Sequence, residues 1–433
     1  MSRLLIRGMV LPMTGPEDFY ADGEIAIDGG RILSVGPRGS IPEGFVPERV
    51  LDYPNDVVMP GLINTHTHAA MTLLRSYADD LPLMPWLEDK VWPFEAKLTD
   101  EDIYWGTALA LAEMIRSGST TMLDMYASMD QVAEAVLSAG TRAVLSRGMI
   151  GYAPNGPKAL QENIELWKTY HQAGDGRVRV MFGPHAPYTC PAEFLQEVKL
   201  EADKLGAGIH IHVAETLDEI KIIQERYGCT PVQWLYDIGL FGGHVVAAHA
   251  VHVTEEDRKI LAKQHVCVAH NPESNMKLNS GTAPIPELIA RGVTVGLGTD
   301  GASSNNNLDL FGEMRTAAFQ QKLRVNSSAL PAYEVLKLAT IGGAQVLGWE
   351  DLGMLAPGFK ADLITINFDQ PHFYPRFSIP AHLVYAAHAG DVRTVIVNGE
   401  VLMEERGLLT LDEKKICVEA ERRAKRIAGD LVK

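Results

Sequence analysis

Between about residue 56 and residue 350, short runs rich in β-branched residues alternate with longer segments whose apolar residues recur every three or four positions. The runs are typical of buried strands, and the longer segments are typical of amphipathic helices. Eight strand segments can be counted: DVVMPGLIN, STTMLDM, TRAVLSRGM, RVRVMFG, AGIHIHV, HVVAAHA, HVCVAH and VTVGLGTD. Because helices separate them, the strands can pair in parallel. The pattern predicts an α/β protein with a closed (β/α)₈ TIM barrel over residues 56–355.

An open, doubly wound sheet is the alternative arrangement of such units. Sheets of that kind often carry a glycine-rich phosphate-binding turn directly after the first strand. Here the first predicted strand leads into THTHAAM, which contains no glycine. The closed barrel is therefore favoured.

The two ends of the chain have a different pattern, with short strands separated by Gly, Asp and Asn turns. Residues 1–55 contain LLIRGMVLP and GEIAIDGGRILSVG, and residues 356–405 contain KADLITIN and VRTVIVNGEVLMEE. We expect these two segments to form one small β-sandwich domain. Residues 406–433 are expected to form a C-terminal helix.

Composition narrows the classes of partner. The formal net charge of −16 would repel both a phosphate backbone and an anionic bilayer, so neither nucleic acid nor membrane is expected as a partner. No apolar run approaches the ~20 residues of a membrane span. The four cysteines are scattered without a CxxC pair, which fits a reducing cytoplasmic location. A small molecule is the expected partner, and a homo-oligomer stays open.

Histidines and one aspartate end several predicted strands. His66 and His68 lie in NTHTH, and a spacing of two places both on one face of an extended chain. His212, His249 and Asp300 close three later strands. The carboxyl ends of barrel strands converge on one site, and polar groups buried there need partners. The set predicts a metal centre at the barrel mouth.

Four motifs in order, PGLINTHTH, HVAE, HNPESNMKLNSG and GTDG, resemble the amidohydrolase superfamily in its cytosine deaminase and chlorohydrolase branch. The likeness spans nearly the whole chain, including the split β-sandwich. Within the branch, PWLEDKVWPFEAKLTDEDIYWG and GPHAPYTC look most like the 5′-methylthioadenosine/S-adenosylhomocysteine deaminases. The resemblance implies hydrolytic deamination of adenine nucleosides to inosine analogues and ammonia by metal-activated water.

The resemblance also implies the ligands of the metal, which are His66, His68, His212 and Asp300. In binuclear members of the superfamily that this chain resembles, a lysine at the end of the fourth strand usually bridges the two metals. Here that strand reads RVRVMFGPHAP and has no lysine, which favours one divalent ion. Three imidazoles and a carboxylate suit Zn²⁺, although Fe²⁺ or Mn²⁺ would accept them as well.

Three catalytic residues are implied in the same way. Asp300 and His249 resemble the pair that accepts the proton of the attacking water, with His249 as a fifth metal ligand the alternative. Glu215 resembles the glutamate that contacts the substrate and protonates a ring nitrogen. Ring protonation matters because negative charge develops on the ring as water attacks.

Glu95, Arg147 and His185 match positions that contact the nucleoside in these deaminases. Glu95 matches a glutamate that binds both ribose hydroxyls, as a carboxylate can accept from two donors at once. Deaminases of free bases and triazine hydrolases would have less use for such a group, so Glu95 discriminates between the substrate classes.

We expect the segment after the first strand to be a long loop that overhangs the barrel mouth. It carries Trp86, Met84 and Trp92, which we expect either to pack locally or to form a lid over the substrate, with Trp86 a substrate contact. A second cation for the carboxylate of S-adenosylhomocysteine is less evident, and Lys158 in the loop after the third strand is the candidate.

Two other functions remain as alternatives. One is an amidohydrolase that acts on a different amino- or chloro-substituted heterocycle, such as another adenosine-type nucleoside, guanine, a pterin or a triazine. The other is a non-catalytic scaffold on the same fold.

Overall fold

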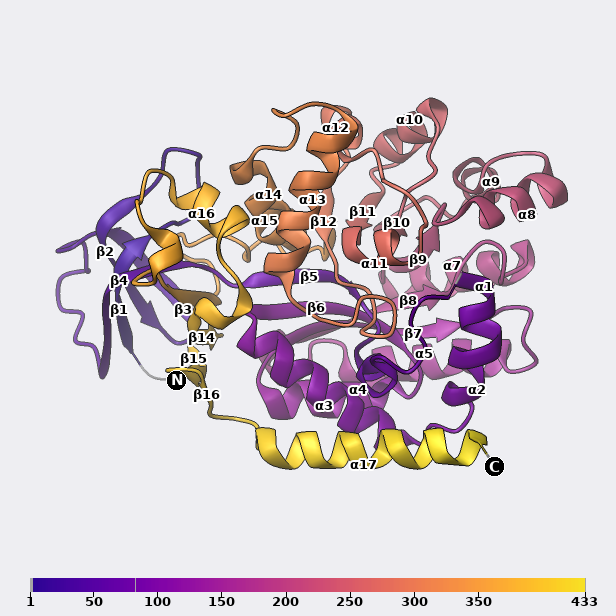
Figure 1. Ribbon diagram of the computed structural model, residues 1–433, viewed down its shortest axis with the longest axis horizontal. Coiled ribbons are helices and arrows are strands. Elements are labelled where there is room, and N and C mark those ends of the chain that lie inside the picture. Colours follow the sequence, from indigo (N-terminus) through magenta and orange to yellow (C-terminus); the bar gives the residue numbers. More distant parts are fainter. Residues whose placement is uncertain (1–2, 82, 433) are drawn as a thin grey trace.

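A computed structural model describes residues 3–81 and 83–432. It contains two eight-stranded sheets; the mixed sheet lies at the left of Figure 1, and the parallel sheet runs from the centre toward the right. The parallel sheet follows the chain in the order β12-β11-β10-β9-β8-β7-β6-β5. Its strands are β5 (Leu62–Thr67), β6 (Ser119–Tyr126), β7 (Arg142–Met149), β8 (Val178–Pro184), β9 (Ile209–Val213), β10 (Val245–His249), β11 (Cys267–His270) and β12 (Val295–Leu297).

The first and last strands meet and close this sheet into a barrel. Asn64 on β5 donates from Nδ2 to Thr299 Oγ1 over 2.8 Å, and its Oδ1 accepts from Thr299 N over 3.0 Å. Gly298 permits this approach, since a Cβ there would lie 2.8 Å from the backbone nitrogen of His66. The predicted (β/α)₈ barrel is confirmed.

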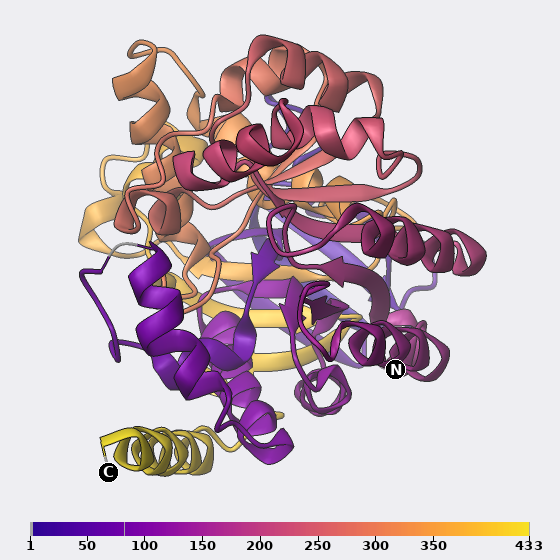
Figure 2. The same ribbon diagram turned by 90° about the vertical axis from the view of Figure 1, so that its right-hand side faces the viewer.

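Helices surround the barrel strands, as Figure 2 shows from one end of the molecule. Those between β5 and β10 are α1 (Leu83–Trp86), α2 (Trp92–Glu95), α3 (Asp100–Arg116), α4 (Met129–Ala139), α5 (Gly156–Tyr170), α6 (Ala173–Gly176), α7 (Ala192–Leu205), α8 (Leu217–Tyr227) and α9 (Pro231–Asp237). Those after β10 are α10 (Glu255–Lys263), α11 (Pro272–Lys277), α12 (Ile285–Ala290), α13 (Leu310–Arg324), α14 (Ala332–Ala339) and α15 (Ile341–Val346).

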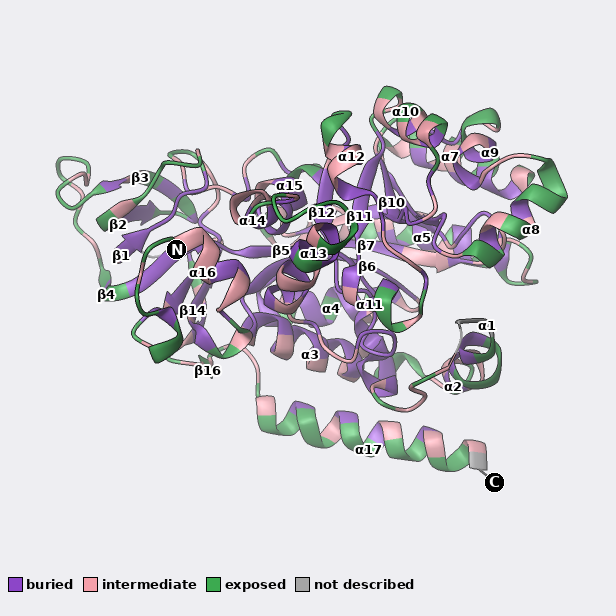
Figure 3. Cartoon of the chain, turned by 45° about the horizontal axis from the view of Figure 1, so that its top comes forward, coloured by how far each residue is buried: buried purple, intermediate pink, exposed green. Residues whose placement is uncertain are grey.

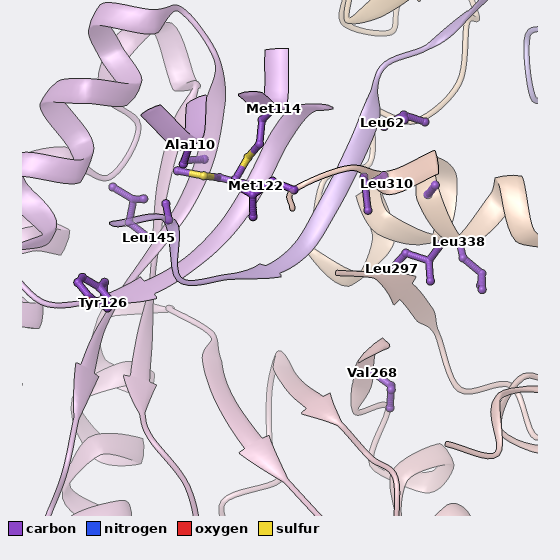
Figure 4. Packing of buried hydrophobic residues seen from close by; sticks show 14 of the residues in the cluster. Leu62, Ala110, Met114, Met122, Tyr126, Leu145, Val268, Leu297, Leu310 and Leu338 are labelled. Carbon is purple, nitrogen blue, oxygen red and sulfur yellow. The ribbon is translucent and has the colours of Figure 1, made fainter. Parts of the chain in front are cut away.

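Apolar side chains fill the space between these helices and the strands. In Figure 4, Met122 of β6 lies beside Ala110 and Met114 of α3, and all three are buried. The helix begins at a capping box in which Thr99 Oγ1 accepts from Asp102 N and the Asp102 carboxylate accepts from Thr99 N. The cap and the apolar face together fix the position of α3 against the sheet.

The second sheet joins both ends of the chain, in the order β16-β15-β14-β13-β4-β1-β2-β3. The N-terminal segment supplies β1 (Leu4–Val10), β2 (Tyr20–Asp28), β3 (Arg31–Pro37) and β4 (Arg49–Pro60). The C-terminal segment supplies β13 (Leu363–Asn367), β14 (Val392–Val397), β15 (Glu400–Glu404) and β16 (Gly407–Leu408), with α16 (Ile379–Tyr385) after β13. We expected a small β-sandwich made from both chain ends; the structure confirms a second β unit made from both ends, and its strands are ordered as one eight-stranded sheet.

One predicted strand is divided between the two sheets. The run DVVMPGLIN was expected to form the first barrel strand, but residues 56–60 belong to β4, which pairs in parallel with β1 and antiparallel with β13. The barrel strand β5 begins only at Leu62. Pro60 and Gly61 separate two apolar runs that sequence alone joins into one. The domain boundaries themselves stay a prediction.

The predicted C-terminal helix is α17 (Glu413–Val432), which runs beside α3 along the lower edge of Figure 1. It begins later than residue 406, where it was expected to start, because Gly407–Leu408 pair with β15 as β16. Arg423 Nη1 donates to Asp102 Oδ1 over 3.0 Å, and Arg426 Nη2 donates to Asp102 Oδ2 over 2.6 Å. Figure 3 shows that many residues on the rest of this helix are exposed. Among the helices of residues 3–81 and 83–432, none combines the length and apolar character needed to cross a bilayer.

Candidate metal centre and active site

A cavity of about 300 Å³ lies at the carboxyl ends of the barrel strands. Side chains from the strand ends form its floor, among them His68, His212, His249 and Asp300. The helical segment after β5 forms a wall through Trp86, Leu87, Val91, Trp92 and Glu95. The predicted site residues on separate strands therefore come together around one cavity.

Each of the first two histidines directs one ring nitrogen toward Asp300. His66 Nε2 lies 3.6 Å and His68 Nε2 lies 3.3 Å from Asp300 Oδ1. The other ring nitrogen of His68 lies 2.6 Å from the carbonyl oxygen of Met125. A carbonyl can only accept, so Nδ1 of His68 carries the proton and Nε2 presents a lone pair to the cavity.

His212 completes the group from the opposite side of the barrel. Its Nε2 lies 3.3 Å from His68 Nε2, and its Nδ1 lies 2.7 Å from the carbonyl oxygen of His185. As with His68, the backbone acceptor fixes the tautomer. The lone pairs of His68 and His212 therefore face each other across a gap suited to a shared cation.

The electrostatics of these groups fit a divalent metal ion. Burial lowers the pKa of His66 and of His212 well below the ordinary value, so both imidazoles are neutral, as metal ligands must be. Among the described residues, the Nε2 of His66 is buried and has no hydrogen-bond partner. Such an atom is costly to bury unless something binds it, and a cation held with Asp300 would remove that cost.

His249 lies beside this cluster and faces two carboxyl groups. Its Nε2 is 3.9 Å from Asp300 Oδ2 and 4.0 Å from Glu215 Oε2, and its Nδ1 is 2.8 Å from Asn275 Oδ1. Burial lowers the pKa of His249, but the charges of Glu215 and Asp300 outweigh that effect and leave this pKa raised. The ring is thus well placed to take up a proton between two acids.

Hydrogen bonds to the carboxylate of Glu219 hold the backbone of Glu215 at the end of β9. Glu219 on α8 accepts from Ala214 N over 2.8 Å and from Glu215 N over 2.9 Å, and Thr216 caps the same helix. Burial raises the pKa of the Glu215 carboxyl, against the opposing charge of His249. A carboxyl group with a raised pKa can donate a proton near neutral pH.

Backbone strain gathers at the same place. Ala214, His249 and Asp300 have φ values of 54°, 75° and 62°, a left-handed region that non-glycine residues rarely occupy. Strain of this kind persists only where the surrounding structure enforces it, and it clusters at functional sites. Here it turns the side chains at the strand ends into the cavity.

The cavity wall carries Glu95, the predicted ribose contact, at the end of α2. Tyr126 Oη donates to Glu95 Oε1 over 2.7 Å. Burial raises the pKa of Glu95, and the hydrogen bond from Tyr126 opposes this rise. The segment expected to be a loop is helical, with the π-helical turn η2 (Leu87–Val91) between α1 and α2. Trp86 is buried on α1 and lines the cavity.

The other two predicted nucleoside contacts, Arg147 and His185, also line the cavity. His185 Nδ1 lies 3.0 Å from Thr189 Oγ1. Arg147 Nε donates to Glu162 Oε2 over 2.8 Å, and Lys158 Nζ lies 3.5 Å from Glu162 Oε1. Lys158 is on the first turn of α5, and not in a loop as expected. The side chain of Met84 lies outside the described residues.

One component of the site was not singled out from the sequence. His210, two residues before His212 on β9, is buried, and its Nε2 lies 2.8 Å from His66 Nδ1. Its Nδ1 lies 3.1 Å from Ser146 Oγ, which donates to Asp124 O over 2.9 Å. The spacing of two in HIH was the available signal, since it places both histidines on one face of the strand.

Comparison with known proteins agrees with this geometry. The chain matches the model of the Amidohydrolase family over residues 57–402. That range covers the barrel and most of the C-terminal part of the second sheet. The chain belongs to the amidohydrolase family, as the motifs at the strand ends indicated.

Individual proteins of similar sequence and structure carry more specific names than the family. A 5-methylthioadenosine/S-adenosylhomocysteine deaminase of Desulfitobacterium hafniense (strain Y51) is 74% identical over 431 residues, covering 100% of both chains. The crystal structure of an adenosine deaminase from Xanthomonas campestris with bound zinc is similar at 35% identity, with a TM-score of 0.95 and 98% of both chains covered. An atrazine chlorohydrolase from Arthrobacter aurescens TC1, complexed with zinc, has 26% identity and a TM-score of 0.91 over 97% of this chain and 100% of that one.

Proposed function

We propose that this protein hydrolyses the exocyclic amino group of adenine nucleosides that carry a 5′ thioether, with 5′-methylthioadenosine and S-adenosylhomocysteine as its substrates. The products are the inosine analogues and ammonia. The observation that carries the proposal is the convergence of Glu215, His249 and Asp300 on one cavity whose wall holds Glu95. The name of the 74% identical relative supports the same substrates.

His66, His68, His212 and Asp300 would hold one divalent ion, for which we propose Zn²⁺. Bound there, it supplies Lewis-acid activation of a water molecule. Three imidazoles with one carboxylate suit zinc, although Fe²⁺ and Mn²⁺ accept the same donors. The absence of lysine from Val178–Pro184 supports a single ion, and the zinc bound by the Xanthomonas campestris structure supports its identity.

Three side chains move protons in this proposal. His249, oriented by Asn275, takes the proton of the attacking water together with Asp300, whose Oδ2 accepts from Ser274 Oγ over 2.7 Å. Glu215 donates its proton to the adjacent ring nitrogen, which neutralises the charge that develops on the purine. As the bond between the attacked carbon and the exocyclic nitrogen breaks, that nitrogen takes the proton held by His249 and Asp300 and leaves as ammonia. The hydroxyl group on the carbon returns its proton to Glu215, which leaves the oxo product. Burial raises the pKa of Glu215, which favours the protonated acid that this role needs.

The remaining residues hold the nucleoside. Glu95 accepts from the two ribose hydroxyls, and Tyr126 fixes the orientation of its carboxylate. His185 and Trp86 contact the nucleoside from the cavity wall. Arg147 and Lys158, which share Glu162, lie where a charged 5′ substituent would leave the cavity, since Arg147 lines both this cavity and the adjoining groove that contains Lys158.

A substrate panel tests this function. The purified enzyme is incubated with 5′-methylthioadenosine, S-adenosylhomocysteine, adenosine, 5′-deoxyadenosine, adenine, guanine, a pterin and an aminotriazine, and ammonia release and product mass are measured. We expect ammonia and a mass gain of about one unit from the thioether nucleosides, because an oxo group replaces an amino group. Turnover of a triazine without any adenine nucleoside would contradict the proposal.

Metal content separates an enzyme from a non-catalytic scaffold on the same fold. We expect about one equivalent of divalent metal per chain after purification without chelator, because four donors converge on one point. Metal-free protein with unchanged stability would favour the scaffold.

The four cysteines are free, which supports the reducing cytoplasm as the location.

A further inference from the structure

A second cluster of metal-ligating side chains lies on the second-sheet end of the molecule, away from the barrel mouth. It consists of His372, His388 and Asp391, which offer ligand atoms within 4.8 Å of one another. His372 lies on the turn η3 (Pro371–Phe373), and Asp391 ends the turn η4 (Ala389–Asp391) just before β14. The turns flank α16, which lies at the upper left of Figure 1.

The separations between ligand atoms match those around a small cation. His372 Nε2 lies 3.1 Å and His388 Nδ1 lies 3.5 Å from Asp391 Oδ2. Zinc–nitrogen and zinc–oxygen bonds of about 2.0 Å in a tetrahedral shell place neighbouring ligand atoms about 3.3 Å apart. The imidazole rings also face one another, with centroids 5.1 Å apart and planes tilted by 31°.

Both turns are held by contacts outside the cluster. Phe373, next to His372, is buried and stacks on Phe368 with ring centroids 3.9 Å apart. On the other turn, Arg406 Nη1 donates to Ala389 O over 2.7 Å. The backbone of both turns is therefore held in place before any ion binds, which lowers the entropy cost of binding.

Local capping accounts for only part of this cluster. Asp391 Oδ2 accepts from His388 N over 3.0 Å, and the two residues form a capping box at η4. That motif needs no residue from η3, yet His372 directs Nε2 at the same carboxylate oxygen from 19 residues earlier in the chain. The Asp391 side chain is 4% exposed, whereas those of His372 and His388 are 35% and 57% exposed. A nearly buried carboxylate thus faces two imidazoles that are open to solvent.

We propose that His372, His388 and Asp391 form a second site for a divalent transition metal of the Zn²⁺ type, separate from the active site. Two imidazoles and one carboxylate are donors for zinc, cobalt, nickel or copper, whereas Mg²⁺ and Ca²⁺ prefer oxygen donors alone. The exposed imidazoles leave the remaining coordination positions to water. The bound ion would join η3 to η4 and so restrain the segment that contains α16. The net charge of −16 favours capture of a cation.

Metal titration of the holoenzyme tests this site. Enzyme with its active site already occupied is titrated with Zn²⁺, and bound metal is counted after desalting. We expect one additional equivalent in the wild type. In His372→Gln and in His388→Gln, its affinity should fall by at least about 100-fold, more than loss of an outer-sphere partner costs. Deaminase activity should be unchanged in both variants, which distinguishes this site from the active site.

His265→Asn is the matched control, because His265 is an exposed histidine outside the cluster, and asparagine tolerates its φ of 54°. The His265→Asn variant should still bind the additional equivalent of Zn²⁺. In a separate control on the wild type, Mg²⁺ should not replace that Zn²⁺. Electron paramagnetic resonance of Cu²⁺ counts the nitrogen ligands in the wild type, so this measurement does not depend on whether a variant folds. One equivalent of Cu²⁺ is added to holoenzyme that carries zinc in its active site, and we expect two coordinating nitrogens. No additional equivalent in the wild type, retention of that equivalent in both cluster variants, or a copper spectrum without nitrogen ligands would overturn the proposal.

Discussion

Two strands of the barrel carry the same His-X-His spacing, and their histidines have different surroundings. On β5, His66 and His68 both direct Nε2 at Asp300. On β9, only His212 reaches the cavity, while His210 lies behind His66 and contacts its Nδ1. A spacing of two decides which face of a strand a side chain occupies, but not how deep in the barrel it lies.

The deeper histidine belongs to a chain of hydrogen bonds with one consistent direction. If Nε2 of His66 presents its lone pair to a metal ion, its Nδ1–H donates to His210 Nε2. His210 Nδ1–H then donates to Ser146 Oγ, and Ser146 donates to the carbonyl oxygen of Asp124. An outer partner of this kind fixes the tautomer of a ligand and raises its basicity. The two motifs therefore predict effects of different size on metal binding and on catalysis.

His66→Ala should give the largest loss. It removes a proposed ligand, so both metal and activity should be lost, with kcat/KM falling by more than about 10⁴-fold because the nucleophilic water is no longer activated. Metal analysis after gel filtration and a deamination assay check this outcome. A variant that kept stoichiometric metal would remove His66 from the proposed ligands.

Glu215→Gln should lose activity but keep metal, since Glu215 is assigned to substrate contact and proton transfer and is not among the proposed metal ligands. We expect kcat to fall by about 10²–10⁴-fold, the range that general acid–base catalysis contributes. The glutamine keeps the shape of the side chain, so binding of a nucleoside product should change little. Equal loss of metal in this variant and in His66→Ala would contradict the separation of roles.

Much of this architecture could be predicted from the sequence because the strongest signals are local. Apolar periodicity predicted the eight barrel strands, and chain order with strand ends predicted which polar residues meet. The run through residues 56–64 was misassigned because hydrophobicity does not show that Val57 and Val58 pair with β1 and β13. Pairing partners are distant in the chain, and a single sequence does not contain them.

The parts of the site outside the strands were harder to predict. The segment that carries Trp86 was expected to be a loop, yet it forms short helices around a π-helical turn whose position depends on packing over the cavity. The ion pair of Arg147 with Glu162 depends on how α5 lies against β7. His210 was missed because depth within a barrel follows from strand stagger, which the sequence pattern leaves open.

His210→Leu should weaken metal binding by about 10–100-fold, as removal of an outer-sphere partner generally does. Leucine leaves Nδ1 of His66 unpaired in a buried place. Activity should return at saturating metal, because His210 does not touch the substrate. His210→Gln is the matched control, since its side-chain oxygen can accept from His66, and it should retain more affinity than the leucine variant. Identical affinities in the two variants would show that the contact with His66 has no part in metal binding.

Ser146→Ala should have the smallest effect, since Ser146 acts on the site only through His210. The change leaves His210 Nδ1–H buried without an acceptor, which should lower the free energy of unfolding by about 1–3 kcal/mol. Metal affinity should fall by less than in His210→Leu, because His210 still accepts from His66. Ser119→Ala is the control, as the buried Oγ of Ser119 has no hydrogen-bond partner among residues 3–81 and 83–432. Denaturant unfolding and metal competition measure the two effects. If Ser146→Ala lost as much metal affinity as His210→Leu, the serine would orient the whole chain of hydrogen bonds from His66 to Asp124. The importance of a histidine for metal binding would then depend less on its depth in the barrel than the comparison of the two His-X-His motifs suggests.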